Sequence, residues 1–200
     1  MNRPNYLAGI RSSILASGRG SAFVSSDFRA IAPPAVIKTA LPRLEEEGLL
    51  RRVMRGVYEY PEYSTFLGER VAPDPHKIAQ AIARNFGWTV VPCGITALNL
   101  LGLSTQVPAS WSYVSSGPYR TYAVNSVKLV FKHTADKEIA QISPKSALVI
   151  QAVKSLGRDG AEDAIPKLQK ILTKAEKAAL IKETQYATAW VFEAAQKISQ

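Results

Sequence analysis

Basic and hydroxyl side chains between positions 25 and 58 are the residues of this chain best suited to bind another molecule. They are Ser25, Ser26, Lys38, Thr39, Arg43, Arg51, Arg52, Arg55 and Tyr58. An arginine can donate two parallel hydrogen bonds to guanine or to a phosphate group, and a threonine or serine hydroxyl can contact a base or a phosphate. These residue types in one short stretch predict contact with double-stranded DNA.

Two helices separated by a proline pair are expected to carry the first part of this set. The hydroxyl of Ser25 or Ser26 can accept a hydrogen bond from a free N–H at the start of a short helix, and such an N-terminus also favours a phosphate. Pro33 disfavours helical backbone at Ala32, and Pro34 can begin the next helix because its missing N–H is not needed there. The turn between the two helices is therefore predicted at the proline pair.

The second helix has an apolar side and a basic side. Its apolar residues, which recur at spacings of one, three and four, are Val36, Ala40, Leu41 and Leu44. Lys38, Thr39 and Arg43 lie on the other side and could reach base edges in a major groove; the alternative is an ordinary solvated face. Pro42 lies inside this helix, so the helix either kinks there or starts later. The acidic run 45–47 would repel phosphate and is expected to point away from a duplex.

A β-hairpin follows the helix. Residues 49–53 and 57–60 are typical of short strands, and residues 54–56 can form a tight turn between them. Arg51 and Arg52 are neighbours on one strand and must point to opposite faces, so only some of the arginines can meet phosphate.

The order of elements indicates a winged helix-turn-helix, in which the second helix enters the major groove and the wing meets the backbone or minor groove. A first helix over 4–16 and a short strand over 22–24 complete this order. If Val57 faces the core, its neighbour Tyr58 lies beside the DNA backbone; a core position for Tyr58 is the equal alternative.

The whole chain is expected to be an α+β protein of two domains. Residues 1–62 form the winged helix-turn-helix, and residues 70–200 form a second domain. In the second domain, a small α/β unit covers 73–133 and a C-terminal helical bundle covers 144–200. The α/β unit is predicted to contain helices 75–85 and 94–101 and strands 88–91, 111–115, 120–124 and 128–131.

The C-terminal bundle is predicted from helical periodicity. Two of its helices are expected over 145–156 and 161–172. Thr173 and Glu176 have the spacing of a capping box, so they predict the start of a third helix. This helix either continues to the end of the chain or breaks near Thr184.

Composition limits the partners and the location. The 200 residues are 46% hydrophobic and carry a formal net charge of +9, which allows a sizeable core and favours polyanionic partners. Cys93 is the single cysteine, so no internal disulfide can form, and a cytoplasmic location is expected. No apolar run approaches the roughly 18–20 residues of a membrane-spanning helix, and no membrane partner is expected.

Three stretches of the chain resemble a known family, the AbiEi-type antitoxins of type IV toxin–antitoxin (abortive infection) systems. The first is DFRAIAPPAVIKTALPRLEEEGLLRRVMRGVYEYP at 27–61, which is similar to the family's winged-helix segment and its wing. The second is PCGITALNLLGLSTQVP at 92–108. The third begins YVSSGPYRTY and ends VKLVFKH, at 113–133.

This resemblance implies two activities. The N-terminal domain of such a protein binds inverted repeats in the promoter of its own operon and represses it. The C-terminal part opposes a toxin with a nucleotidyltransferase-like fold, and in type IV systems it does so without a stable complex. The alternatives are a stand-alone winged-helix transcriptional regulator whose second domain senses a ligand or partner, and an interaction module that no longer contacts DNA.

Catalysis has little support in the sequence. A nucleophilic Cys93 would need a nearby base, and the two histidines, His76 and His133, are distant in sequence. One cysteine and two histidines also make a poor zinc set, and Asp27 and Asp74 are interpreted as helix-capping carboxylates. No glycine-rich phosphate loop occurs. We therefore expect no enzyme activity, no cofactor and no metal site.

A second basic set lies in the C-terminal bundle. It consists of Lys167, Lys170, Lys174 and Lys177, with Lys182 farther on. If the helices were continuous, these lysines could line one side and form a surface for RNA or for the toxin. The alternative is an ordinary solvated face, as is usual for lysine.

Overall fold

The computed structural model describes residues 5–135, 139 and 141–200. The protein is a mixed α+β structure and divides into two compact units. The first contains the chain up to Trp88 together with 124–126, and the second contains 89–123 and the chain from Val127 onward. Among the helices of the described ranges, none has both the length and the hydropathy that crossing a bilayer requires.

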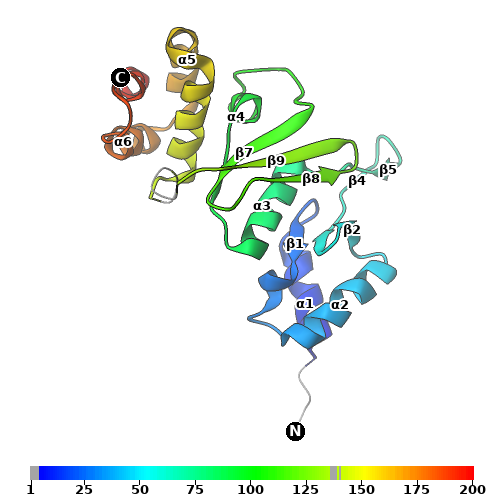
Figure 1. Ribbon diagram of the computed structural model, residues 1–200. Coiled ribbons are helices and arrows are strands. Elements are labelled where there is room, and N and C mark those ends of the chain that lie inside the picture. Colours follow the sequence, from blue (N-terminus) through cyan, green and yellow to red (C-terminus); the bar gives the residue numbers. More distant parts are fainter. Residues whose placement is uncertain (1–4, 136–138, 140) are drawn as a thin grey trace. The chain divides into compact units, whose positions relative to one another are not determined.

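The first unit contains helices, a three-stranded sheet and a two-stranded hairpin (Figure 1). Its helices are α1 (Tyr6–Ala16), the 3-10 helix η1 (Ser25–Phe28), α2 (Pro34–Glu46) and α3 (Pro75–Phe86). A buried apolar cluster joins the first three of them, with Ile10 and Ile14 from α1, Phe28 from η1, and Leu41 and Leu44 from α2. The periodic apolar positions of the sequence thus face one common core, which stabilises the unit.

Helix α2 begins at the proline that the sequence predicts. Pro34 is its first residue, and Gly48, with a φ of 78°, follows its end in the left-handed conformation that glycine tolerates. Pro42 lies inside the helix, so the later start considered for α2 was wrong. The fixed φ of Pro42 is helical, and the residue costs the helix only the hydrogen bond that its missing N–H cannot donate to Lys38 and the crowding of its ring.

The sheet of the first unit has three antiparallel strands in the order β1-β3-β2. The strands are β1 (Ala22–Val24), β2 (Arg51–Met54) and β3 (Val57–Glu59). Gly56 has a φ of 80° and forms the tight β2–β3 turn with Arg55. A second, two-stranded hairpin, β4 (Tyr63–Ser64) and β5 (Glu69–Arg70), follows.

Helix α3 packs on this sheet and not in the second unit. It contacts β1, β3 and η1, and Arg84 joins it to Asp27 with an Nε–Oδ1 distance of 3.0 Å. The same guanidinium donates to the carbonyl oxygen of Ala22 at 2.9 Å. The sequence predicted this helix in the second domain, because an ion pair between residues 57 positions apart leaves no trace in local sequence spacing.

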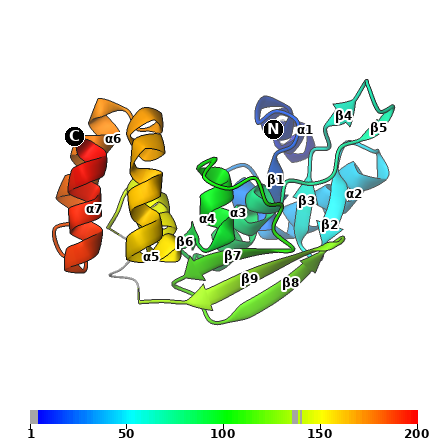
Figure 2. The same cartoon turned by 90° about the horizontal axis from the view of Figure 1, so that it is seen from above.

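The second unit contains a four-stranded sheet of order β6-β7-β9-β8 (Figure 2). Its strands are β6 (Val90–Pro92), β7 (Ser110–Ser115), β8 (Arg120–Val124) and β9 (Val127–His133). Strand β7 is antiparallel to β6 and parallel to β9, and helix α4 (Ile95–Leu100) connects β6 to β7. Tyr113 and Phe131 are register partners whose rings stack at 5.5 Å, and both are fully buried.

Three helices complete this unit, and both views show them grouped together. They are α5 (Pro144–Ile171), α6 (Lys174–Glu183) and α7 (Ala189–Ser199). The backbone of α5 leaves helical geometry at Gly157, which divides it close to the predicted gap. Thr173 and Glu176 form the predicted capping box, and α6 ends at Thr184, so the break predicted as one alternative is confirmed.

Candidate nucleic-acid interface

The solvent face of α2 carries the side chains that the sequence singled out. Ile37, Ala40, Leu41 and Leu44 are buried. Lys38, Thr39 and Arg43 are all exposed. The hydroxyl of Thr39 donates to the carbonyl oxygen of Val36 at 2.9 Å, so its donor is used within the helix and its oxygen lone pairs stay available to accept. The structure thus brings these three residues to one accessible surface.

Arg43 is not an isolated cation. Its Nε donates to Oε1 of Glu47 at 3.0 Å, and the guanidinium of Arg11 on α1 donates to Oε2 of the same carboxylate. These hydrogen bonds, first that of Arg11 and then that of Arg43, hold the pKa of Glu47 below its usual range. Glu47 is therefore ionised near neutral pH and lies between two arginines.

The three arginines of the β2–β3 hairpin have different surroundings. Nε of Arg51 donates to Oε2 of Glu59 at 2.9 Å, and Arg51 also donates to the carbonyl oxygen of Val71 at 2.8 Å. The side chain of Glu59 is only 3% exposed, so Arg51 neutralises a buried carboxylate and is not available to phosphate. Arg52 and Arg55 are exposed.

Tyr58 lies in the core of the first unit, so a position beside a DNA backbone was wrong for it. Burial raises the pKa of its phenol, because the phenolate would lose its hydration. Alternation of side chains along the strand did not predict this burial, because β3 is the central strand and has neighbours on both sides and on both faces. Val57 and Glu59 are buried as well.

Ser25 and Ser26 are not helix caps. Both lie inside η1, and the group that accepts at its start is the carboxylate of Asp27, with 2.9 Å from the Val24 nitrogen to Oδ2. Ser25 is exposed, whereas the Ser26 hydroxyl is buried and has no hydrogen-bond partner within the described residues. The interpretation of Asp27 as a capping carboxylate is therefore confirmed. Ser26, whose hydroxyl is buried, is no longer a candidate DNA contact.

Arg29 is an exposed cation outside the set predicted from the sequence. It lies between η1 and α2, in the turn before the proline pair, and its position there was the signal that could have identified it. Together with Lys38, Arg52 and Arg55 it forms what we call the unpaired cation set. None of these four forms an ion pair with any acidic side chain that the structure describes.

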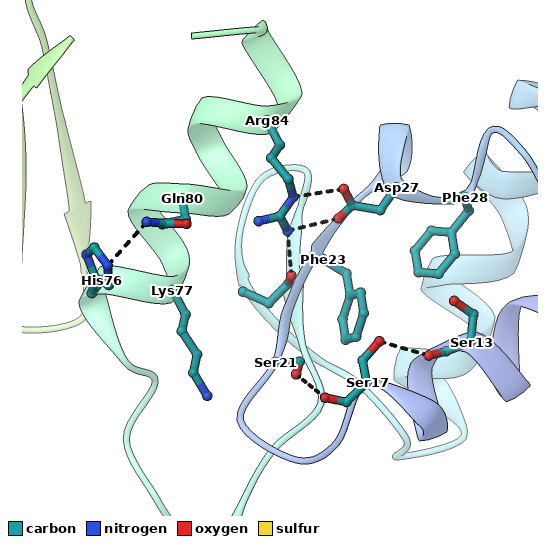
Figure 3. A pocket seen from close by; sticks show the side chains of 11 residues that line it. Ser13, Ser17, Ser21, Phe23, Asp27, Phe28, His76, Lys77, Gln80 and Arg84 are labelled. Carbon is teal, nitrogen blue, oxygen red and sulfur yellow. Dashed lines mark hydrogen bonds and ion pairs between the residues drawn. The ribbon is translucent and has the colours of Figure 1, made fainter. Parts of the chain in front are cut away.

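A polar pocket of about 450 Å³ lies elsewhere on the first unit, and Figure 3 shows the side chains that line it. The hydroxyls of Ser17 and Ser21 donate to carbonyl oxygens of the preceding turns and have a structural role. His76 Nε2 is 3.2 Å from the amide nitrogen of Gln80. Burial lowers the pKa of His76, and the nearby Asp74 opposes this only in part, so the imidazole is mostly neutral at neutral pH.

Asp74 caps α3 as predicted, accepting from the His76 nitrogen at 2.8 Å.

Cys93 is buried, and burial raises the pKa of its thiol, which keeps it protonated and poorly nucleophilic. Across residues 5–135, 139 and 141–200, no group of three or more histidine, cysteine, aspartate or glutamate side chains could hold a metal ion.

The C-terminal lysines belong to two helices. Lys167 and Lys170 are exposed on α5, whereas Lys174 and Lys177 lie on α6 after the chain has left helical geometry at Leu172. The condition of a continuous helix is therefore not met, and helical spacing does not place the four on one side.

Comparison with known proteins gives a family but no activity. Residues 9–180 match a family described as a family of unknown function (DUF6088). None of the curated proteins matches the chain significantly. The crystal structure of RV2827C protein from Mycobacterium tuberculosis is similar with a TM-score of 0.43 and 17% identity, covering 99% of this chain and 77% of that one. Because the family match spans most of its length, this protein belongs to the DUF6088 family.

Proposed function

We propose that this protein is a DNA-binding autorepressor and antitoxin of the AbiEi type, with a winged helix-turn-helix in its first unit. The observation that carries the proposal is the unpaired cation set. Lys38 stands on the exposed face of α2, and Arg55 stands on the turn of the β2–β3 hairpin. These are the two elements with which a winged helix-turn-helix contacts the major groove and the adjacent backbone or minor groove.

In this proposal, α2 is the recognition helix. Lys38, Thr39 and Arg43 face the major groove, and Arg52 and Arg55 contact phosphate from the wing. A backbone-contacting cation displaces counterions from the duplex, so each such contact makes binding more dependent on salt. Arg29 is positioned in the turn before α2 and adds a phosphate contact.

The test is a binding titration with duplex DNA from the region upstream of the protein's own operon. Lys38→Ala, Arg43→Ala and Arg55→Ala are each compared with Lys154→Ala, which removes one exposed lysine from α5. We expect each of the first three to weaken binding roughly tenfold. Arg55→Ala, which removes a phosphate contact, should also reduce the salt slope by about one. Unchanged affinity for all three variants would refute α2 and the wing as the binding surface.

The antitoxin role rests on the resemblance and is tested separately. The partner expected from the resemblance is a nucleotidyltransferase-like toxin, with no stable complex required. Co-expression of the chain with the product of the adjacent gene should restore growth that the toxin alone arrests. Replacing Lys167, Lys170, Lys174 and Lys177 together by glutamine then tests whether the lysines of α5 and α6 contribute. Growth arrest that persists with the wild-type chain would exclude the antitoxin role.

A further inference from the structure

Glu47 occupies an unusual place for an acidic residue. It is the C-terminal cap of α2, where the partial negative charge of the helix end disfavours a carboxylate. Two arginines compensate for this position: Arg43 from the same helix and Arg11 from α1. The three side chains form what we call the Arg11–Glu47–Arg43 cluster.

The cluster is open to water. The side chain of Arg43 is 65% exposed, that of Arg11 39% and that of Glu47 33%. Ion pairs with this exposure contribute little to stability, because water screens them and holding long side chains in place costs entropy. The cluster therefore has a small part in holding the fold together, and its partners can separate at little cost.

The carboxylate of Glu47 presents two anionic oxygens to the arginine donors, and a DNA phosphate presents the same kind of acceptor. Arg43 cannot donate the same N–H to both at full strength. Only Nε of Arg43 donates to Glu47, so a phosphate that binds this side of the guanidinium must displace the carboxylate, whose negative charge also repels a phosphate nearby.

We infer that Glu47 is an intramolecular competitor of DNA phosphate, which holds Arg43 in the free protein and lowers the affinity for DNA of any sequence. This inference rests on the proposed DNA-binding function. Its consequence is a lower affinity for every duplex that Arg43 contacts, because displacing Glu47 costs the same free energy whatever the DNA sequence.

The experiment compares Glu47→Gln with Glu46→Gln. Both variants remove one negative charge at neighbouring positions, and Glu46 is exposed and forms no ion pair among the described residues. The probes are a fluorescein-labelled random duplex and a duplex from the upstream region, titrated at several salt concentrations. Thermal unfolding of both variants checks that they remain folded.

We expect Glu47→Gln to bind the random duplex several-fold more tightly than Glu46→Gln, with a salt slope steeper by about one, since a cation released from Glu47 becomes available to phosphate. The gain should be similar on the upstream duplex, because the cost of displacing Glu47 is paid in the free protein and does not depend on DNA sequence. The gain should also largely disappear when Arg43→Gln is present, since the competition acts through Arg43.

If the wild type binds DNA but Glu47→Gln and Glu46→Gln bind it with equal affinity, Glu47 acts only through net charge. That result would overturn this inference and leave the proposed DNA-binding function standing. A gain that persists fully in the Arg43→Gln background would also overturn it. Absence of DNA binding by the wild type at low salt would instead overturn the proposed function and the inference with it.

Discussion

Two arginine–glutamate pairs of the first unit have the same chemistry and opposite surroundings. Arg43 and Glu47 meet at the end of α2, where their side chains are 65% and 33% exposed. Arg51 and Glu59 meet between β2 and β3, where the values are 25% and 3%. The difference teaches that burial, and not the kind of pair, decides whether an ion pair maintains the fold or stays available for exchange with a ligand.

The largest expected effect is on the buried pair. Arg51→Ala leaves the carboxylate of Glu59 buried without its cation, so we expect a loss of about 3 kcal/mol in the free energy of unfolding. Urea denaturation monitored by circular dichroism measures this loss. Arg52→Ala, a change at the exposed neighbour, is the control and should alter stability by less than about 0.5 kcal/mol. Equal effects of the two substitutions would contradict the comparison.

A double replacement separates the need for charge from the need for volume. Arg51→Met combined with Glu59→Leu removes both charges and keeps apolar volume, so we expect it to recover most of the stability that Arg51→Ala loses. The same urea titration measures the recovery. A double variant that is as unstable as Arg51→Ala would show that the hydrogen bond from Arg51 to the carbonyl oxygen of Val71 is the main contribution.

The exposed pair should show the reverse pattern. Arg43→Ala is expected to change the free energy of unfolding by less than about 0.5 kcal/mol, as for other exposed pairs, while DNA affinity falls. Parallel denaturation and binding titrations on one preparation check both quantities. A large loss of stability with unchanged affinity would assign Arg43 to the fold.

The smallest expected effects concern pH. Folding raises the pKa of Tyr58 above its usual value of 10.0. The contribution of Tyr58 to the free energy of unfolding is therefore present below pH 10 and is lost as the pH rises through the folded-state pKa. Tyr58→Phe should therefore reduce the alkaline loss of stability.

The lowered pKa of Glu47 affects stability at acidic pH. The contribution of Glu47 to the free energy of unfolding is present above the usual carboxyl pKa and is lost as the pH falls through the folded-state pKa. Glu47→Gln should flatten the acid limb of the stability curve.

Local signals in the sequence predicted most elements of the fold. Pro34 began α2, Gly56 formed the hairpin turn, and Thr173 with Glu176 capped α6, because each acts within a few residues of itself. The exposed face of α2 was predicted for the same reason, since helical periodicity separates Lys38 from the buried leucines. The order of elements in the second unit followed from the same patterns.

Pairing between distant residues was beyond these signals. The ion pair between Arg84 and Asp27 attaches α3 to the first unit. The central position of β3 buries Tyr58, for which alternation along the strand allowed either a core or a DNA-facing position. The predicted role of Ser25 and Ser26 failed because Asp27 lay in the better position to accept from the Val24 nitrogen.

By itself, the amino-acid sequence determined where helices, strands and turns lie and which residues of α2 face water, because those properties depend on dihedral preference and periodicity over a few residues. Only the tertiary structure decided which cations are free. Arg51 and Arg52 are adjacent and identical in type, yet one neutralises buried Glu59 and the other stays exposed. The physical reason is that the availability of a charge depends on its surroundings in space, which folding alone assembles.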